Sequence, residues 1–283
     1  MFRIFSSFVL LCVTRITHAD SHIANVTSPA SELISALLEN YDPRATPPQT
    51  STVRIQISLN QLVEVNTADQ TITFNAWIRH YWDDNRLKWN ASEWENVSYI
   101  HLPPSQVWYP DVLAYETLNE FVPNKLALVG VSSSGSLFIS VNVMKTIACT
   151  MQLQKFPFDV QSCKFTMGSW AYTGSDYDLK PRLSGTSHAA IDLGVFQQSN
   201  DISLQGVETK EVTFLYNCCP DPYPLIEYTL YLRREPLSYI YSVAIPMITA
   251  TMVGFLGFVI FFSLSRFHST IITTTTTDFC SLH

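Results

Sequence analysis

The chain carries little charge. Asp, Glu, Lys and Arg make up only 14% of its 283 residues, and there is no lysine- or arginine-rich run. The net charge of −7 argues against a nucleic-acid partner and weakly favours a cationic ligand. Low charge together with 47% hydrophobic residues fits a secreted or membrane-tethered domain better than a cytosolic enzyme.

The chain also lacks the sequence patterns of catalysis. It has no nucleophile elbow and no glycine-rich phosphate loop, and its seven histidines are scattered rather than spaced as metal ligands. We therefore expect a protein that is not an enzyme and that needs no cofactor or metal.

The N-terminus indicates entry into the secretory pathway. Residues 1–19 have the pattern of a signal peptide, with Arg3 before a short apolar core and Ala19 at the expected cleavage site. Sequons at Asn25, Asn90 and Asn96 predict N-glycosylation. In the oxidising compartment that this implies, cysteines are expected to form disulfides.

Cys149 and Cys163 enclose thirteen residues, with Phe156-Pro157-Phe158-Asp159 near their centre. A disulfide here would close a short loop and contribute about 2–4 kcal/mol of stability. Loop tips are usually polar, so an aromatic tip indicates docking against a membrane or another domain, although an ordinary stabilising disulfide explains the spacing equally well. Pro157 is a candidate for a cis peptide bond, because only X-Pro bonds adopt cis at low cost.

Cys218 and Cys219 are neighbours in the sequence, and Cys280 is left without an obvious partner. Adjacent Cα atoms lie about 3.8 Å apart, below the usual disulfide range of about 4.4–6.8 Å, so a bridge between them would be strained. Two unrelated thiols or two separate disulfides are the alternatives. Tyr216, Tyr223 and the intervening prolines form a stiff aromatic hairpin tip, which favours the bridge.

Residues 20–236 are expected to form an all-β domain. Between residues 53 and 234, strand-like runs rich in β-branched and aromatic residues recur every 8–15 residues, separated by turn-forming residues. This pattern predicts a β-sandwich. Apolar positions at helical spacing predict a preceding helix over residues 31–40, with Ser31 as its N-cap.

Residues 237–264 are expected to form a transmembrane helix. Residues 239–264 carry no charge, and such a helix is long enough to cross a hydrocarbon core of about 30 Å. A buried core helix is the alternative, and Pro246 is tolerated better in a membrane helix than in a soluble one. Residues 265–283 form a low-complexity tail with a run of five threonines.

Aromatic residues cluster in several loop-like segments. Most tryptophans and tyrosines pack in cores, so the default assignment of these rings is to the core. The alternative is an aromatic cage, in which several rings around one cavity bind a quaternary ammonium ion. Each good cation–π contact of that kind contributes about 0.5–2 kcal/mol.

Five motifs, occurring in the family's order, make the chain resemble an α-type nicotinic acetylcholine receptor subunit, in the Cys-loop family of pentameric ligand-gated ion channels. The resemblance covers roughly residues 31–260. The motifs are Trp77 with Trp82-Asp83, Trp108 with Pro110-Asp111 and Tyr115, the Cys149–Cys163 loop, Gly168-Ser169-Trp170 with Tyr172, and Tyr216 with Cys218-Cys219 and Tyr223.

The resemblance implies a twisted, immunoglobulin-like β-sandwich with an N-terminal helix, assembled as a homo- or hetero-pentamer in the cell membrane, with synapses as a candidate location. Acetylcholine or a similar quaternary ammonium ligand would bind between subunits, with Trp170 giving the main cation–π contact. The principal face would contain Tyr115, Trp170, Tyr172, Tyr216, Cys218, Cys219 and Tyr223. A neighbouring subunit would contribute Trp77, with Phe138 and Ser140 at more variable positions.

Several departures from the family pattern matter, and those at Leu225 and Phe261 bear on signalling and on the pore. Leu225 stands where an aspartate usually follows the last site tyrosine and helps to couple the hairpin to the channel. Phe261 stands where a proline usually leads into the pore helix, and that helix and the two after it are absent. The expectation is thus a channel subunit truncated after its first membrane helix. The alternatives are a non-channel acetylcholine-binding protein, a dominant-negative partner, or an adhesion domain without ligand affinity.

Overall fold

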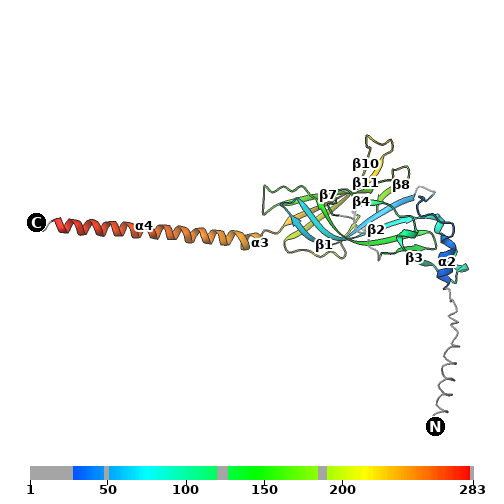
Figure 1. Ribbon diagram of the computed structural model, residues 1–283, viewed down its shortest axis with the longest axis horizontal. Helices are drawn as coiled ribbons and strands as arrows, with labels where there is room; N and C mark the ends of the chain where they lie inside the picture. The colour runs from blue at the N-terminus through cyan, green and yellow to red at the C-terminus, as the bar shows by residue number, and fades with distance from the viewer. Residues whose placement is uncertain (1–27, 48–50, 120–126, 184–189, 281–283) are drawn as a thin grey trace, which may run out of the picture.

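The computed structural model describes residues 28–47, 51–119, 127–183 and 190–280. Two β-sheets form a sandwich, a short helix lies at one end of it, and a long helix projects from the other end (Figure 1). The predicted signal peptide over residues 1–19 and the sequon at Asn25 lie outside the described residues.

The first sheet has seven strands in the order β3-β5-β6-β2-β1-β8, with β9 pairing on β1. The second sheet has four strands in the order β10-β11-β7-β4. All neighbours are antiparallel except β8 and β9, which run parallel to β1. The strands are β1 (Ser51–Asn66), β2 (Thr71–Asp83), β3 (Tyr99–Leu102), β4 (Val112–Ala114), β5 (Val129–Ser132), β6 (Ser136–Ala148), β7 (Val160–Ser169), β8 (Tyr177–Pro181), β9 (Ile191–Asp192), β10 (Ile202–Phe214) and β11 (Tyr223–Arg234).

The core lies between the two sheets. In β6, Leu137, Ile139 and Val141 are buried, while Phe138 and Ser140 between them are only partly buried. This alternation is what a strand with one face on the core requires. Three short 3₁₀ turns connect the strands around it, η1 (Asn85–Leu87), η2 (Ala91–Glu93) and η3 (Pro104–Gln106). The prediction of an all-β sandwich is confirmed.

Large aromatic side chains fill the centre of the sandwich. Trp82 and Trp108 are 1% and 2% exposed. The Phe165 ring stacks on Tyr228 with centroids 5.2 Å apart, joining two neighbouring strands of the second sheet. For these residues the default assignment of aromatic residues to the core is confirmed.

The N-terminal helix α2 spans Pro29–Leu38, not residues 31–40. Its N-cap is Ser28, whose side chain accepts a hydrogen bond from the Ser31 backbone N–H at 3.2 Å. The prediction of Ser31 as the cap is therefore wrong. The reason is Pro29, which suits the first helical turn because its ring fixes φ and its missing N–H needs no partner there.

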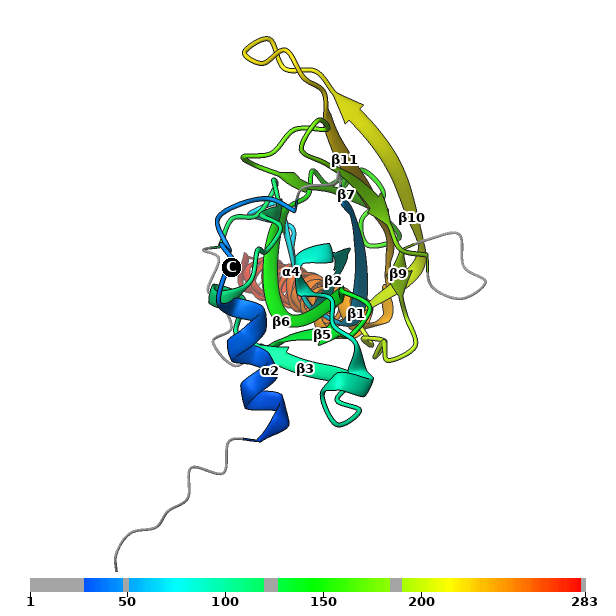
Figure 2. The same ribbon diagram turned by 90° about the vertical axis from the view of Figure 1, so that its right-hand side faces the viewer.

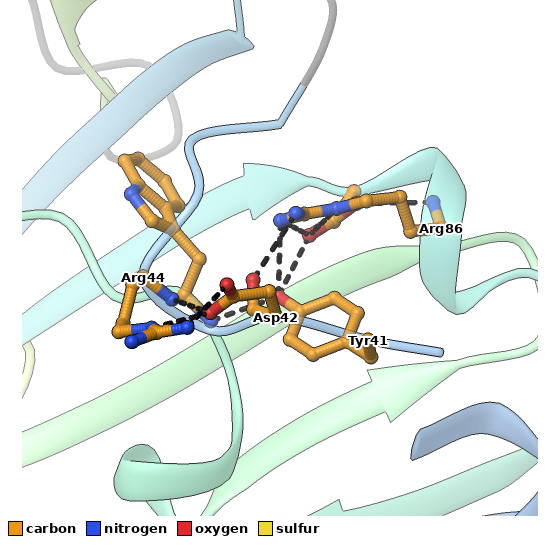
Figure 3. A network of polar contacts seen from close by, with 6 residues as sticks. Tyr41, Asp42, Arg44 and Arg86 are labelled. Carbon is orange, nitrogen blue, oxygen red and sulfur yellow. Dashed lines mark hydrogen bonds and ion pairs between the residues drawn. The ribbon is translucent and has the colours of Figure 1, made fainter. Parts of the chain in front are cut away.

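A polar network joins the segment after α2 to the sandwich (Figure 3). The Tyr41 hydroxyl donates to Asp84 Oδ2 at 2.9 Å and accepts from the Trp108 backbone N–H at 2.8 Å. Asp84 is fully buried and pairs with Arg86, with Nη2 and Oδ2 2.7 Å apart. Burial raises the pKa of Tyr41 well above its usual range. Since the Tyr41 hydroxyl and the buried Asp84 carboxylate both have partners, the network fixes the segment after the helix against the domain.

One continuous helix follows β11, formed by α3 (Leu237–Tyr239), a π-helical turn η4 (Ile240–Ala244) and α4 (Ile245–Cys280). Leu237–Arg266 is long and apolar enough to cross a membrane, and none of it is buried in the protein. The helix runs past the predicted end at residue 264 into the low-complexity tail. No glycine or proline occurs after Gly257, so no residue type that readily ends a helix interrupts it.

The Cys149–Cys163 disulfide and the cis Phe156–Pro157 peptide bond are both present, as predicted. The loop tip lies against the start of the long helix, where the Phe156 and Tyr239 rings meet edge to face at 4.9 Å. Behind the tip, Asp159 and Arg234 form a buried ion pair, with Oδ1 and Nε 3.0 Å apart. The aromatic tip is thus a docking surface for another part of the same chain.

Candidate ligand-binding site

The hairpin between β10 and β11 extends beyond the rest of the sandwich (Figure 2). The two strands stay in register up to Phe214 and Tyr223, so residues 215–222 form the tip. The Tyr216 and Tyr223 rings meet edge to face at a centroid distance of 5.3 Å. The hairpin therefore brings together the two tyrosines that flank the adjacent cysteines in the sequence.

A second aromatic pair lies where β4 and β7 end. Tyr115 follows β4, and its backbone N–H donates to the Thr166 carbonyl of β7 at 3.0 Å. Its ring meets the Trp170 ring edge to face at 6.2 Å. Trp170 is 74% exposed, whereas Trp82 and Trp108 are buried. An indole left this exposed is available to a ligand or a partner surface.

The backbone at Trp170 is held by Asp111. One carboxylate oxygen of Asp111 accepts from the backbone N–H groups of Trp170 and Ala171, at 3.1 and 2.7 Å. The other accepts from the hydroxyls of Ser169 and Tyr177. The sequence marked Asp111 as part of a motif but gave it no role. A carboxylate with all of these partners fixes the turn that presents the indole.

The two aromatic pairs face the same region. Burial, together with smaller effects of the nearby hydroxyls of Tyr216 and Tyr223, raises the pKa of Tyr115 to about 12. The Tyr115 hydroxyl donates to the Ser169 carbonyl at 2.7 Å, which fixes its orientation. Four of the predicted ligand-binding rings, Tyr115, Trp170, Tyr216 and Tyr223, therefore form one group, which we name the cage rings.

The hairpin tip is tied to the loop after Trp170. The Gly174 backbone N–H donates to the Pro222 carbonyl at 2.8 Å, and the Ser175 hydroxyl donates to Asp221 Oδ2 at 3.1 Å. Tyr172, in the same loop, turns toward the core, where its ring meets Trp108 at 6.1 Å and Tyr177 at 5.6 Å. Its predicted ligand contact remains a prediction.

Gly168 is a further residue that positions the cage rings, and sequence reasoning gave it no role of its own. A Cβ at this position would lie 2.3 Å from Leu225 Cδ2 and 2.8 Å from the Tyr115 hydroxyl oxygen. A side chain would therefore displace Tyr115. The available signal was a glycine inside a strand, which often marks a close approach.

Cys218 and Cys219 carry free thiols in the structure, with their Sγ atoms 2.6 Å apart. This arrangement differs from that of Cys149 and Cys163, which are bonded. The predicted bridge between the neighbouring cysteines remains a prediction. Among the described residues, no group of three or more His, Cys, Asp and Glu side chains is arranged to hold a metal ion.

The residues predicted to face a neighbouring subunit lie elsewhere, on the outer side of the seven-stranded sheet. Trp77 belongs to β2, and Phe138 and Ser140 belong to the adjacent β6. The Arg79 guanidinium lies 5.8 Å from the Trp77 ring centroid and forms an ion pair with Asp192 at 2.9 Å. The sheet therefore presents these residues on one face.

The two described sequons are at the surface. Asn90 caps η2 by accepting from the Ser92 backbone N–H, and its amide also donates to Glu93 at 2.9 Å. Asn96 is exposed and has a positive φ of 63°, a conformation that asparagine tolerates better than most residues. Both asparagines are accessible on the folded domain, as a glycan requires.

Comparisons with known proteins agree with this architecture. Residues 30–236 match the family described as the neurotransmitter-gated ion-channel ligand binding domain. The chain therefore belongs to this family. Its relatives are receptor subunits rather than enzymes, as the sequence predicted.

Similar proteins include the acetylcholine receptor subunit alpha-type acr-16 of Caenorhabditis briggsae, which is 30% identical over 254 residues, covering 88% of this chain and 50% of that protein. The alpha-type des-2 subunit of Caenorhabditis elegans is 33% identical, over 86% of this chain and 45% of that protein. The neuronal subunit alpha-9-I of Oncorhynchus mykiss is 31% identical, over 81% of this chain and 40% of that protein. The chain thus spans about half the length of the relatives it matches.

Proposed function

We propose that this chain is an acetylcholine-binding subunit of a neurotransmitter-gated ion channel and that the cage rings supply the principal side of the site. The observation that carries the proposal is the exposed indole of Trp170, 74% accessible and paired with Tyr115. An open aromatic face at this position suits a quaternary ammonium ligand, because the ring quadrupole attracts a cation.

The opposite side of the site would come from a neighbouring subunit. Trp77, Phe138 and Ser140 lie on the outer face of the other sheet, so the same chain can offer this surface to a partner in a homo- or hetero-pentamer. In this arrangement residues 20–236 lie outside the cell and residues 237–264 cross the membrane, with synapses as the expected location. The exposed apolar stretch Leu237–Arg266 supports the membrane assignment.

A disulfide between Cys218 and Cys219 is part of the proposal. It would replace two neighbouring thiols by a rigid ring at the tip, between Tyr216 and Tyr223. The 2.6 Å separation of the Sγ atoms and the oxidising compartment expected for a secreted domain support this pairing. Mass spectrometry of peptides alkylated without reduction would detect it as a loss of two hydrogen masses.

Equilibrium binding of radiolabelled acetylcholine to membranes from cells expressing the full chain tests the proposed function. Trp170→Ala should lower affinity by at least about tenfold, the equivalent of about 1.4 kcal/mol. Phe158→Ala is the matched control. Phe158 is also a highly exposed aromatic residue, 65% accessible, but it lies in the Cys149–Cys163 loop, away from the cage rings. Equal affinity of the wild-type chain and Trp170→Ala would contradict the proposal.

A further inference from the structure

The outer face of the seven-stranded sheet carries two arginines around Tyr81. The Arg182 guanidinium lies over the Tyr81 ring, 3.8 Å from its centroid. Arg54 of β1 is exposed and pairs in register with Tyr81 of β2. The Tyr81 ring also meets the Phe138 ring at 4.8 Å. The two arginines, which we name the basic face, therefore lie beside the surface that the proposed function assigns to contact with a neighbouring subunit.

Two further cations on this side of the sheet are paired within the chain. Arg79 Nη1 lies 2.9 Å from Asp192 Oδ2. Lys180 Nζ lies 3.0 Å from Glu211 Oε2. Each of these pairs brings a carboxylate to its cation, so they add little to the net charge of the surface.

The arginines of the basic face differ from these paired cations. Among the described residues, neither Arg54 nor Arg182 forms an ion pair. The segments 48–50 and 184–189, which are close to them in sequence and lie outside the described residues, contain no acidic residue. The basic face is thus a surface that a carboxylate of another molecule suits.

The hairpin tip and the loop bound to it carry the opposite charge. Asp221 lies in the tip and accepts a hydrogen bond from the Ser175 hydroxyl at 3.1 Å, and Asp176 is the next residue of that loop. Neither carboxylate forms an ion pair with a described residue. The sequence contains no lysine or arginine within residues 165–179 or 211–232. We name these two carboxylates the acidic tip.

The basic face and the acidic tip do not meet within one chain. The hairpin extends away from the four-stranded sheet, whereas the basic face lies on the outside of the other sheet (Figure 2). Asp176 precedes β8 and Arg182 follows it, so about 20 Å of extended chain separates them. A second copy of the chain offers each surface its complement.

We propose that the acidic tip of one copy of this chain binds the basic face of a second copy, so that the neighbour at the proposed site is the same chain. The meaning of the contact for the ligand site rests on the proposed function, but the contact itself needs no ligand. An arginine stacked on an aromatic ring can still bind a carboxylate through the N–H groups at the edge of its guanidinium.

The contact also positions the rest of the neighbouring surface. Because Phe138 contacts Tyr81, binding at the basic face would bring Phe138 and Ser140 of the second copy toward the cage rings of the first. The two surfaces differ, so the contact is head-to-tail, and its repetition around a ring gives a closed cyclic assembly. Complementary charge of this kind speeds association and disfavours partners that lack it.

Co-purification of two differently tagged copies of the full chain, co-expressed and extracted in detergent, tests the contact. Wild-type copies should co-purify. Arg54→Glu with Arg182→Glu should lower co-purification at least tenfold, and so should Asp176→Lys with Asp221→Lys. When these two double variants are co-expressed with different tags, co-purification should return, because each surface again meets one of opposite charge.

The matched control is Lys88→Glu with Lys155→Glu. Both lysines are exposed and lie outside the basic face and the acidic tip, and this double variant changes the net charge as much as the reversal of the two arginines. It should co-purify like the wild-type chain. Thermal unfolding of each purified variant separates lost association from lost folding.

Unchanged co-purification of either folded double variant would overturn the proposal, as would wild-type copies that do not co-purify. Failure of the mixed double variants to recover would do the same. Acetylcholine binding is measured on the same samples. Charge-dependent co-purification without acetylcholine binding would contradict the proposed function alone, whereas acetylcholine binding with charge-independent co-purification would contradict this contact alone.

Discussion

Two regions of the sandwich use aromatic residues in opposite ways. At the end that carries the long helix, Phe156 packs on Tyr239, a disulfide closes the loop, and a buried ion pair joins Asp159 to Arg234. Beside the β10–β11 hairpin, Trp170 is left exposed. The first region satisfies its contacts within the chain, whereas the second keeps its rings accessible to a ligand.

The largest expected effect is on stability at the helix end. Arg234→Met leaves Asp159 buried without its cation and should lower the free energy of unfolding by about 3–5 kcal/mol. Hydrogen bonds to Arg234 and Gln161 outweigh burial and lower the pKa of Asp159, so the carboxylate is charged at neutral pH. Thermal or denaturant unfolding in detergent measures the loss.

The matched control for this prediction is the exposed ion pair of Asp42 with Arg44, whose side chains are 48% and 88% accessible. Arg44→Met should change the free energy of unfolding by less than about 1 kcal/mol. Similar losses in Arg44→Met and Arg234→Met would contradict the distinction between a buried and an exposed pair. Acetylcholine affinity of the folded Arg234→Met protein should be unchanged.

The next largest effect is a pH dependence that originates in the core. Burial lowers the pKa of His80 to about 4, compared with about 6.5 in an unfolded chain. The unfolded state therefore binds a proton first, and His80 should reduce stability by up to about 3 kcal/mol as the pH falls from 6.5 to 4. Above pH 6.5 the imidazole is neutral in both states, so His80 should not change the free energy of unfolding with pH.

Unfolding midpoints measured across this pH range would check the effect of His80. His80→Leu should flatten the acid side of the curve, whereas His101→Gln, at an exposed position on β3, should leave its shape unchanged. An identical slope in the wild-type chain and His80→Leu would show that His80 is not the group responsible.

A smaller effect is expected from a change behind the cage rings. Gly168→Ala would place a Cβ 2.8 Å from the Tyr115 hydroxyl, so the ring must shift. We expect acetylcholine affinity to fall about tenfold, or about 1.4 kcal/mol. The control is Gly206→Ala in β10, where the nearest atom to a Cβ is 3.8 Å away. Equal affinities for the two variants would exclude this role for Gly168.

Local signals in the sequence predicted much of the fold. Strand alternation predicted the sandwich, and the apolar tip around Pro157 predicted both a docking surface and the cis bond. The helix start was missed because Ser28 and Ser31 are both good caps, and only the position of Pro29 distinguishes them. The helical tail was not predicted because a threonine run has weak intrinsic preference for a helix.

The site was predicted only in part, for a physical reason. Motif order singled out the four cage rings, because each ring belongs to a short motif that can be read locally in the sequence. The supporting contacts depend on strands distant in sequence: Asp111 reaches Trp170, and Tyr115 reaches Ser169. Single-sequence patterns do not encode such distances.

The most direct test of the central claim compares acetylcholine with its neutral carbon isostere, 3,3-dimethylbutyl acetate, on membranes carrying the full chain. Cation–π recognition predicts that the wild-type chain binds acetylcholine about tenfold more tightly than the isostere. In Trp170→Leu most of that preference should disappear. A preference for the charged ligand that is unchanged in Trp170→Leu would contradict the assignment of Trp170 as the cation-binding ring.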